Sequence, residues 1–276
     1  MSFKLIADSG STKTHWLIKS LNGESREFYT QGLNPYFIST QDVVAILNKE
    51  LTEHECAGIS SVEFYGAGCK ADDKCKLIEL AFSQVLANAD IKVNSDLLGS
   101  AIALFPNGKG VACILGTGSN AAVFNNFQFT DSIQSLGYVL GDEGSGNYFG
   151  KILLRDFFQN IMPIDISKKF AREFDIDYNQ VLNSIYKEPF ANRYLARFSV
   201  FLSSNRGEYY IENMLSEGFQ AFVNSQLSTL KFNKSEMEVA FVGSIAYHFR
   251  DVLTDVLFKN GYRIASIIKE PMEGLA

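Results

Sequence analysis

Short apolar runs separated by turn residues mark the start of the chain. Residues 3–7, 14–21 and 25–30 are each of strand length. Asn22 and Gly23 separate the second and third runs, and this dipeptide is typical of a two-residue β-hairpin turn. The pattern predicts three antiparallel strands, which disfavours a plain Rossmann unit.

The hydrophobic period changes near residue 40. Val43, Val44, Leu47 and Leu51 follow helical spacing, and Thr40 is the expected N-cap. The next runs predict strands over 61–65 and 91–93 and helices over 72–87 and 97–105. One face of the helix over 72–87 is expected to carry Leu77, Leu80, Ala81 and Val85.

The second half of the chain opens with the same order of elements. Residues 111–115 and 121–124 predict strands on either side of a glycine and hydroxyl turn. Two related domains explain this repeat, and chance recurrence of a short glycine-rich turn is the alternative. Residues 106–110 are turn formers, so we predict domains over 1–105 and 106–276.

Helical spacing dominates residues 163–232, where no catalytic pattern is visible. The aromatic residues there are expected to form an interhelical core: Tyr194, Phe198, Phe201, Phe219 and Phe222. A helix over 145–160 is predicted before this stretch, and strands over 238–242 and 262–268 are predicted after it, with a helix between them.

Composition excludes several classes of function. The 276 residues carry a net charge of −6 without a basic block, which argues against nucleic acid as a partner. No apolar run has the length of a membrane span, and no secretory signal precedes the first strand. We therefore expect a cytoplasmic protein without a membrane partner.

The cysteines point to neither a disulfide framework nor a metal site. Cys56, Cys69, Cys75 and Cys113 include no CxxC pair. In a reducing compartment such residues are expected to be free, partly buried thiols.

The turn over 8–14 carries a carboxylate, hydroxyls, a glycine and a lysine. Gly10 permits close approach of the backbone to a ligand. The hydroxyls and exposed backbone N–H groups of this turn, which includes Ser11 and Thr12, suit phosphate oxygens, and Lys13 supplies a positive charge. Asp8 suits Mg²⁺ held through water. A polar hairpin turn is the alternative interpretation.

Two further polar residues follow predicted strands. Asp96 lies between a strand end and a helix start, where a carboxylate serves either as a general base or as a helix N-cap. Asn34 precedes Pro35, which holds it extended, so its amide is a candidate to face a ligand. An ordinary loop is the alternative there.

Glycine-rich turns follow two later strands. Four glycines within residues 137–146 surround Asp142 and Glu143, before a helix whose N-terminus favours anionic or oxygen-rich ligands. Matching of these carboxylates to a helix start is the alternative. Gly243 and Ser244 follow a later strand, and that turn is compatible with a nucleotide.

The ordered set of motifs resembles the actin-like ATPase superfamily of sugar kinases, and more narrowly the N-acetylglucosamine kinase and BadF/BadG ATPase family. The most specific likeness lies in residues 140–145 and 116–120. The resemblance implies an α/β fold of two actin-like, ribonuclease H-like domains. Each would be a mixed five-stranded sheet with flanking helices, with ATP and sugar in the cleft between them.

The resemblance also implies roles for individual residues. Asp96 would be the catalytic base, which reverses the preference for a helix cap that its position alone suggests. Phosphate and magnesium contacts would come from Asp8, Gly10, Thr12, Lys13, Gly116, Thr117 and Gly118, and adenosine contacts from Gly243 and Ser244. Sugar contacts would come from Asn34, Asp96, Ser119, Asn120 and Asp142.

The chain departs from the family pattern in two places and ends early. The family has an aromatic residue two positions after the matching asparagine, and the residue at that position here is Tyr36. The family also has a Trp-Gly pair ahead of the Asp-Glu motif, where this chain has Leu136-Gly137. The family continues with a helix beyond residues 271–276, so we expect an incomplete tail.

The expected function is phosphorylation of an amino sugar, with N-acetylglucosamine at O6 favoured, by ATP with Mg²⁺. Homodimers are common among proteins of this fold, so a homodimer is the expected partner state. Two other functions remain open: a BadF/BadG-type ATPase activator and a non-catalytic sugar sensor on the same fold.

Overall fold

A computed structural model describes residues 2–10, 12–20 and 22–276. The chain divides into two compact units, unit 1 (Met1–Ala103 and Pro271–Ala276) and unit 2 (Leu104–Glu270). The division falls two residues before the boundary expected from the turn at 106–110. It also places the last six residues with unit 1, whereas we had assigned them to the C-terminal domain.

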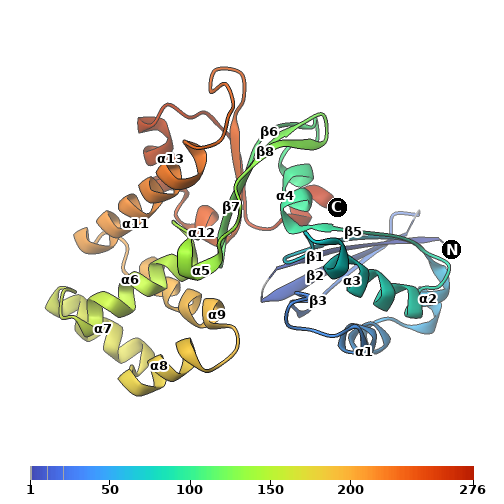
Figure 1. Cartoon of the computed structure of the whole chain (residues 1–276), viewed down its shortest axis with the longest axis horizontal. Helices are drawn as coiled ribbons and strands as arrows, with labels where there is room; N and C mark the ends of the chain where they lie inside the picture. Colours follow the sequence, from blue (N-terminus) through green and yellow to red (C-terminus); the bar gives the residue numbers. More distant parts are fainter. Residues whose placement is uncertain (1, 11, 21) are drawn as a thin grey trace. The chain divides into compact units, whose positions relative to one another are not determined.

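Unit 1 contains one mixed five-stranded sheet in the order β3-β2-β1-β4-β5 (Figure 1). The strands are β1 (Phe3–Ser9), β2 (Lys13–Ser20), β3 (Ser25–Gln31), β4 (Ile59–Gly66) and β5 (Asp90–Ser95). The first three form the expected antiparallel meander, and β4 and β5 add in parallel to β1.

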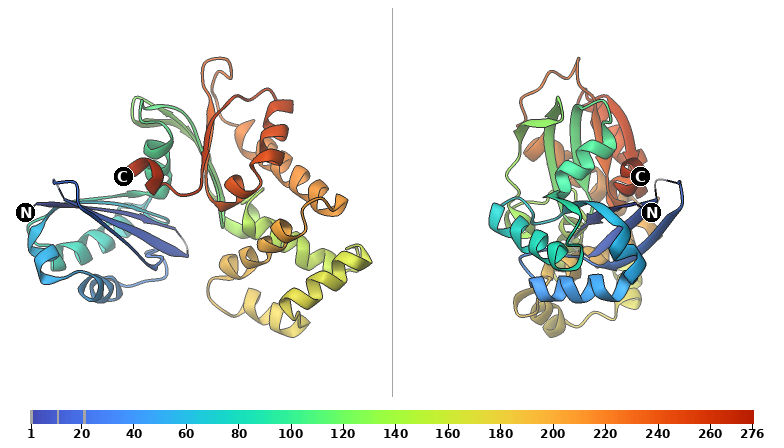
Figure 2. Two further views of the ribbon diagram at one scale, coloured as in Figure 1. Left: turned by 180° about the vertical axis from the view of Figure 1, so that it is seen from behind. Right: turned by 90° about the vertical axis from the view of Figure 1, so that its right-hand side faces the viewer.

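Helices cover both faces of this sheet. Successive residues of a strand point to opposite sides, and β1 carries apolar side chains on each side. The helices are α1 (Thr40–Glu50), α2 (Glu53–Gly58), α3 (Asp72–Val85), α4 (Asp96–Leu104) and α14 (Met272–Leu275). Leu5 packs toward α1 and α3, which lie on one face (Figure 2). Ile6 packs on the other face against Met272 of α14, which explains why the last residues belong to unit 1.

Two local expectations for unit 1 are wrong. The N-cap of α1 is Ser39 rather than Thr40, because Ser39 and Asp42 form a reciprocal capping box. The expected face of α3 is wrong in part: Ala81 is buried and Leu77 and Val85 pack against the core, but Leu80 is 54% exposed. The fully buried residues beside Ala81 are Ile78 and Phe82. The apolar stripe is therefore rotated by about one residue from the expected one.

Unit 2 repeats the sheet of unit 1. Its order is β10-β9-β6-β7-β8, so each strand occupies the place of the corresponding strand of the first sheet. The strands are β6 (Lys109–Leu115), β7 (Ser119–Asn125), β8 (Gln128–Ser132), β9 (Val239–Val242) and β10 (Ile264–Ile268). Two mixed five-stranded sheets with flanking helices confirm the predicted fold class.

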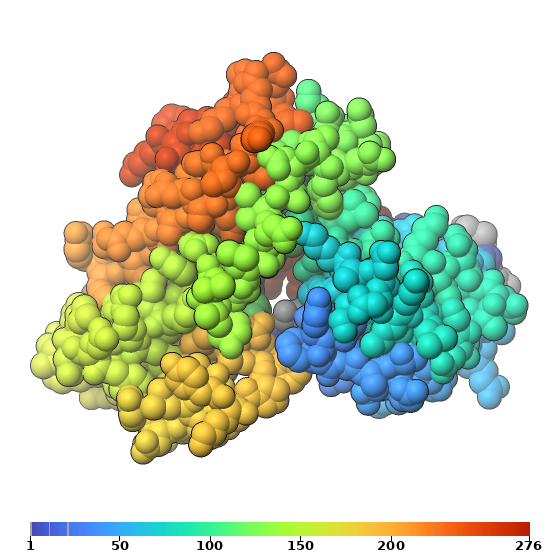
Figure 3. Space-filling model, viewed as in Figure 1, coloured from blue at the N-terminus to red at the C-terminus, as the bar shows by residue number. Residues whose placement is uncertain are grey.

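Helices make up most of the rest of unit 2. They are α5 (Gly137–Leu140), α6 (Gly146–Phe158), α7 (Ile164–Phe174), α8 (Tyr178–Tyr186), α9 (Ala191–Ala196), a 3₁₀ turn (Arg197–Ser199), α10 (Val200–Ser204), α11 (Tyr209–Phe222), a π-helical turn (Val223–Leu227), α12 (Ser244–His248) and α13 (Arg250–Lys259). Phe198, Phe201, Phe219 and Phe222 are fully buried, as expected of a core. Figure 3 shows α7 and α8, in yellow-green and yellow, at the surface of this unit. None of the helices that the structure describes is long and apolar enough to cross a membrane.

Candidate functional site

The turn between β1 and β2 is held by Ser9, a residue that sequence reasoning did not select. Ser9 Oγ lies 2.8 Å from Thr14 Oγ1 and accepts from the backbone N–H of Leu33 at 2.9 Å. The Ser9 carbonyl accepts from Ala67 N–H at 2.8 Å. This fully buried serine therefore fixes the turn against two neighbouring loops.

The candidate phosphate-binding residues lie on and beside this turn. Asp8 is half-buried near the end of β1, and the backbone N–H of Gly10 donates to the Lys13 carbonyl at 3.0 Å. Thr12 and Lys13 are exposed, and Lys13 Nζ lies 4.8 Å from the centre of the Tyr29 ring. Ser11, which the hypothesis also used, lies outside the described residues.

Asn34 is partly engaged within its own loop. Its Oδ1 accepts from the backbone N–H of Tyr36 at 3.0 Å. Gly68 has a φ of +85°, and a Cβ there would come within 2.5 Å of the same Oδ1. The side-chain amide Nδ2 of Asn34 is therefore the group suited to donate to a ligand hydroxyl.

Asp96 is the first residue of α4, but it is not the helix cap. Ser95 Oγ accepts from Leu98 N–H at 3.3 Å, which is the side-chain contact of an N-cap. Asp96 Oδ1 instead accepts from Leu97 N–H at 2.9 Å. Burial raises the pKa of Asp96, and the hydrogen bonds from backbone N–H groups oppose that rise. A raised pKa makes a carboxylate a better proton acceptor.

In unit 2, the start of α6 is hydrogen-bonded to the glycine loop over 116–119. Gly146 N–H donates to the Gly116 carbonyl at 2.8 Å, and Asn147 N–H donates to the Thr117 carbonyl at 3.1 Å. Tyr148 N–H is directed at Ser145 Oγ at 3.4 Å. The expectation that the α6 N-terminus offers its N–H groups to a ligand is therefore wrong, because protein acceptors already engage them.

Asp142 is the centre of a buried polar cluster. Its Oδ1 accepts from Ser119 N–H at 3.2 Å, and its Oδ2 accepts from Asn147 Nδ2 at 2.7 Å. A Cβ on Gly118 would lie 3.0 Å from Oδ2, so the glycine makes room for this carboxylate. Burial raises the pKa of Asp142, and the Asn147, Ser119 and Lys151 interactions lower it.

A cavity of about 160 Å³ lies beside this cluster. Ser119, Asn120 and Asp142 line it, so three of the predicted sugar-contacting residues are brought together. Asn120 Oδ1 accepts from Ala121 N–H at 2.9 Å. The π-helical turn contributes Ser225 and Gln226 to the same wall.

Asn147, Ser225 and Gln226 are the residues of this site that sequence reasoning missed. Ser225 Oγ donates to Glu143 Oε2 at 3.2 Å, and Gln226 Nε2 donates to Ser119 Oγ at 2.8 Å. Residues 225 and 226 lie in a stretch with helical spacing and no catalytic pattern. The sequence offered no signal for them beyond two polar residues within an apolar helix.

The fold requires a glycine at position 243 for a reason other than the predicted approach of a nucleotide. Its φ is +126°, and a Cβ there would lie 2.3 Å from the Leu115 carbonyl oxygen. The glycine is therefore required by contact between the ends of β9 and β6, whatever ligand lies nearby. Ser244 is exposed and begins α12.

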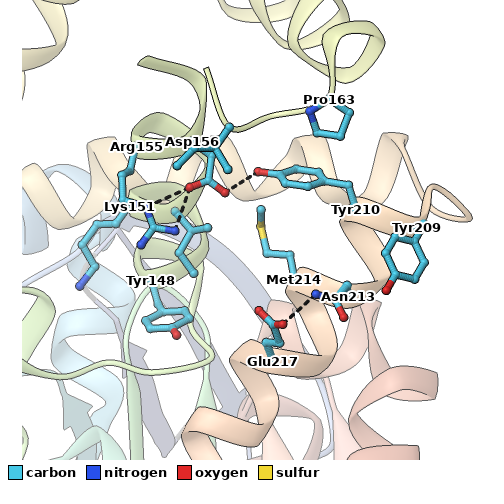
Figure 4. A pocket seen from close by; sticks show the side chains of 12 residues that line it. Tyr148, Lys151, Arg155, Asp156, Pro163, Tyr209, Tyr210, Asn213, Met214 and Glu217 are labelled. Carbon is cyan, nitrogen blue, oxygen red and sulfur yellow. Dashed lines mark hydrogen bonds and ion pairs between the residues drawn. The ribbon is translucent and has the colours of Figure 1, made fainter. Parts of the chain in front are cut away.

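A larger cavity of about 830 Å³ lies between α6 and α11. Figure 4 shows Asp156 between Arg155 and Tyr210, and Asn213 beside Glu217. Asp156 accepts from Arg155 Nε at 2.9 Å and from the Tyr210 hydroxyl at 2.9 Å, and Asn213 donates to Glu217 at 2.8 Å. The Asp156–Tyr210 contact joins α6 to α11, and each of the other two pairs lies within a single helix. We therefore assign these polar side chains a structural role.

Comparisons with known proteins give three informative structures. A Porphyromonas gingivalis protein, described provisionally as an N-acetylglucosamine kinase, is 35% identical, with 100% of this chain and 97% of that chain covered and a TM-score of 0.91. A Chromobacterium violaceum protein with the same provisional description is 15% identical, with 99% and 97% covered and a TM-score of 0.69. Schistosoma mansoni hexokinase, complexed with glucose, is 14% identical, with 99% and 83% covered and a TM-score of 0.51. The last two show a likeness of fold alone, and neither a family model nor a curated protein matches the chain.

Proposed function

Because the chain belongs to the N-acetylglucosamine kinase family of actin-like ATPases, we propose that it is an ATP-dependent amino-sugar kinase. N-acetylglucosamine is the proposed substrate, and its O6 hydroxyl is the acceptor. The observation that carries the proposal is the 35% identity with the Porphyromonas gingivalis protein over the whole chain. The cluster around Asp142 supports it, because carboxylate, amide and hydroxyl groups are those that bind sugar hydroxyls.

The proposal gives each group of residues a role. The sugar would be contacted by Asn34, Asp96, Ser119, Asn120 and Asp142. The phosphates would be contacted by Gly10, Thr12, Lys13, Gly116, Thr117 and Gly118, and adenosine by Gly243 and Ser244. Gly116 fits this role, because a Cβ there would meet no described atom within 4 Å, so the space above it suits a ligand.

Asp8 is the residue proposed to hold Mg²⁺. The described residues contain no group of three His, Cys, Asp or Glu side chains arranged around a metal. A single carboxylate fits Mg²⁺, which keeps several waters and is bound through one or two carboxylates plus substrate phosphates. The ion would neutralise charge on the phosphoryl oxygens.

Asp96 is proposed to act as the general base. Its carboxylate takes the proton of the O6 hydroxyl while a bond forms between O6 and the γ-phosphorus. The bond from that phosphorus to the β,γ-bridging oxygen breaks, and ADP leaves with the electron pair. A positioned base contributes about 10²–10⁴-fold to the rate, so Asp96→Asn should lower kcat by that factor.

Release of ADP in the presence of different sugars tests the proposal. The panel contains N-acetylglucosamine, glucosamine, N-acetylmannosamine and glucose, each with ATP and Mg²⁺. Asp90→Asn is the matched control, because Asp90 is an exposed aspartate at the opposite end of β5 from Asp96. Its Oδ2 lies 3.6 Å from Lys92 Nζ. Sugar-dependent turnover that Asp96→Asn removes and Asp90→Asn retains is the expected result. Sugar binding without turnover would instead indicate a sensor.

A further inference from the structure

The π-helical turn after α11 directs two consecutive polar side chains at the candidate sugar site. The backbone N–H of Ser228 bonds to the Val223 carbonyl at 2.9 Å, five residues back. Such a turn inserts one residue into the helix and is frequent at functional sites. Here the turn lets Ser225 hydrogen-bond to Glu143 and Gln226 hydrogen-bond to Ser119. Val223 and Leu227 remain in the core.

The side-chain amide of Gln226 is only half satisfied. The residue is 4% exposed, and Nε2 donates to Ser119 Oγ at 2.8 Å. Oε1 has no hydrogen-bond partner among the described residues. A buried polar atom without a partner is destabilising, so stability alone favours an apolar side chain here. Gln226 also lines the 160 Å³ cavity, where a ligand can supply the missing donor.

The bond from Gln226 also sets the role of the Ser119 hydroxyl. A hydroxyl that accepts from Nε2 keeps its own hydrogen to donate elsewhere. The pair therefore presents an acceptor, Oε1, beside a donor, the Ser119 hydroxyl. A secondary amide offers an N–H that can donate to Oε1, and a methylene group at the same position offers no donor.

From this geometry we infer that Gln226 is a specificity-determining residue, which reads the acylamino substituent of the sugar. The inference rests on the proposed kinase function and adds to it a residue outside the recognised motifs. The N–H of the substituent donates to Gln226 Oε1, and the Ser119 hydroxyl donates to a neighbouring oxygen of the sugar.

Selectivity between N-acetylglucosamine and 2-deoxyglucose tests the inference. Gln226→Met keeps an unbranched side chain of similar size but removes both polar atoms. We expect the ratio of kcat/KM for the two sugars to fall by about 10-fold or more, through a raised KM for N-acetylglucosamine. Gln220→Met is the control, because Gln220 lies on α11 and bonds to Asn224 and Asn260, away from the cavity.

A second variant covers failure of the first to fold. Gln226→Leu removes the same polar atoms with a shorter, branched side chain, so selectivity falls again. An unchanged ratio in a variant that melts in one cooperative transition overturns the inference alone. Absence of wild-type turnover on every sugar overturns the proposed kinase function, and the inference with it.

Discussion

The amide nitrogen Nδ2 of Asn147 lies 2.7 Å from Oδ2 of Asp142, and this contact ties the first turn of α6 to the carboxylate of the glycine-rich loop. Asp142 has a φ of +64°, a conformation that few non-glycine residues adopt. The Asn147 amide and the Ser119 N–H each donate to the side-chain carboxylate and so fix its position. The orientation of Asp142 is thus set before any ligand binds.

Replacing Asn147 by aspartate should destabilise the protein at neutral pH. The new carboxylate faces Asp142, so the pKa of the pair rises further above that in the unfolded chain. Groups with a raised folded-state pKa favour the protonated form. The loss of stability, roughly 2–3 kcal/mol, should therefore appear as pH rises above the ordinary aspartate range and shrink as pH falls.

Thermal melting across this pH range measures the effect. Asn213→Asp is the control, because Asn213 and Glu217 form the same kind of pair on the exposed side of α11. Equal losses of stability in the two variants would contradict the role of burial.

Gly243→Ala should destabilise unit 2 by about 3 kcal/mol or more. The substitution places a Cβ 2.3 Å from the Leu115 oxygen and forces an alanine to a φ of +126°. Gly207→Ala meets nothing within 4 Å but also has positive φ, +87°, so it should cost only about 1–2 kcal/mol. Denaturant unfolding compares the two, and a Gly243 variant as stable as the Gly207 variant would argue against the close contact.

The pH dependence of kcat/KM should reveal Asp96. A general base works when deprotonated, so activity should be present above its pKa and lost as pH falls through it. Because burial raises the pKa of Asp96, the acid limb should lie above the ordinary range of an aspartate. The residual activity of Asp96→Asn should lack this limb. An identical limb in that variant would assign the titration to another group.

Ser9→Ala should weaken the first turn. It removes the contact with Thr14 Oγ1 and leaves the buried N–H of Leu33 without its acceptor, at a cost of about 1–3 kcal/mol. Ser83→Ala should be nearly neutral, because Ser83 is exposed on α3 and its hydroxyl donates to the Glu79 carbonyl of its own helix. Melting temperatures of both variants give the comparison.

Local patterns predicted the strands and helices well, because hydrophobic period depends on near neighbours. The repeated strand–turn–strand order correctly indicated two related sheets. The choice of Thr40 over Ser39 as a cap was wrong because both residue types suit that position. Asp42, three residues after Ser39, was the available signal.

The site was less accessible from sequence, because its contacts are distant along the chain. Gln226 and Ser119 are separated by 107 positions, and only the fold brings them together. The α6 N-terminus looked like a ligand site because the carbonyls that engage it, from Gly116 and Thr117, lie in another element. Gly243 was predicted to let the backbone approach a nucleotide, and the constraint that the fold imposes on it comes from Leu115.

The packing of α14 on unit 1 has a consequence for biosynthesis. A ribosome produces residues 1–103 first and then the whole of unit 2 before it reaches Met272. At 5–20 residues per second, that interval is on the order of ten seconds. Throughout it, the face of the first sheet formed by Ile6, Leu17 and Tyr65 lacks the side chain of Met272 that later packs against it. Unit 2, by contrast, is continuous in sequence, so the nascent chain holds all of its residues before those of unit 1 are complete.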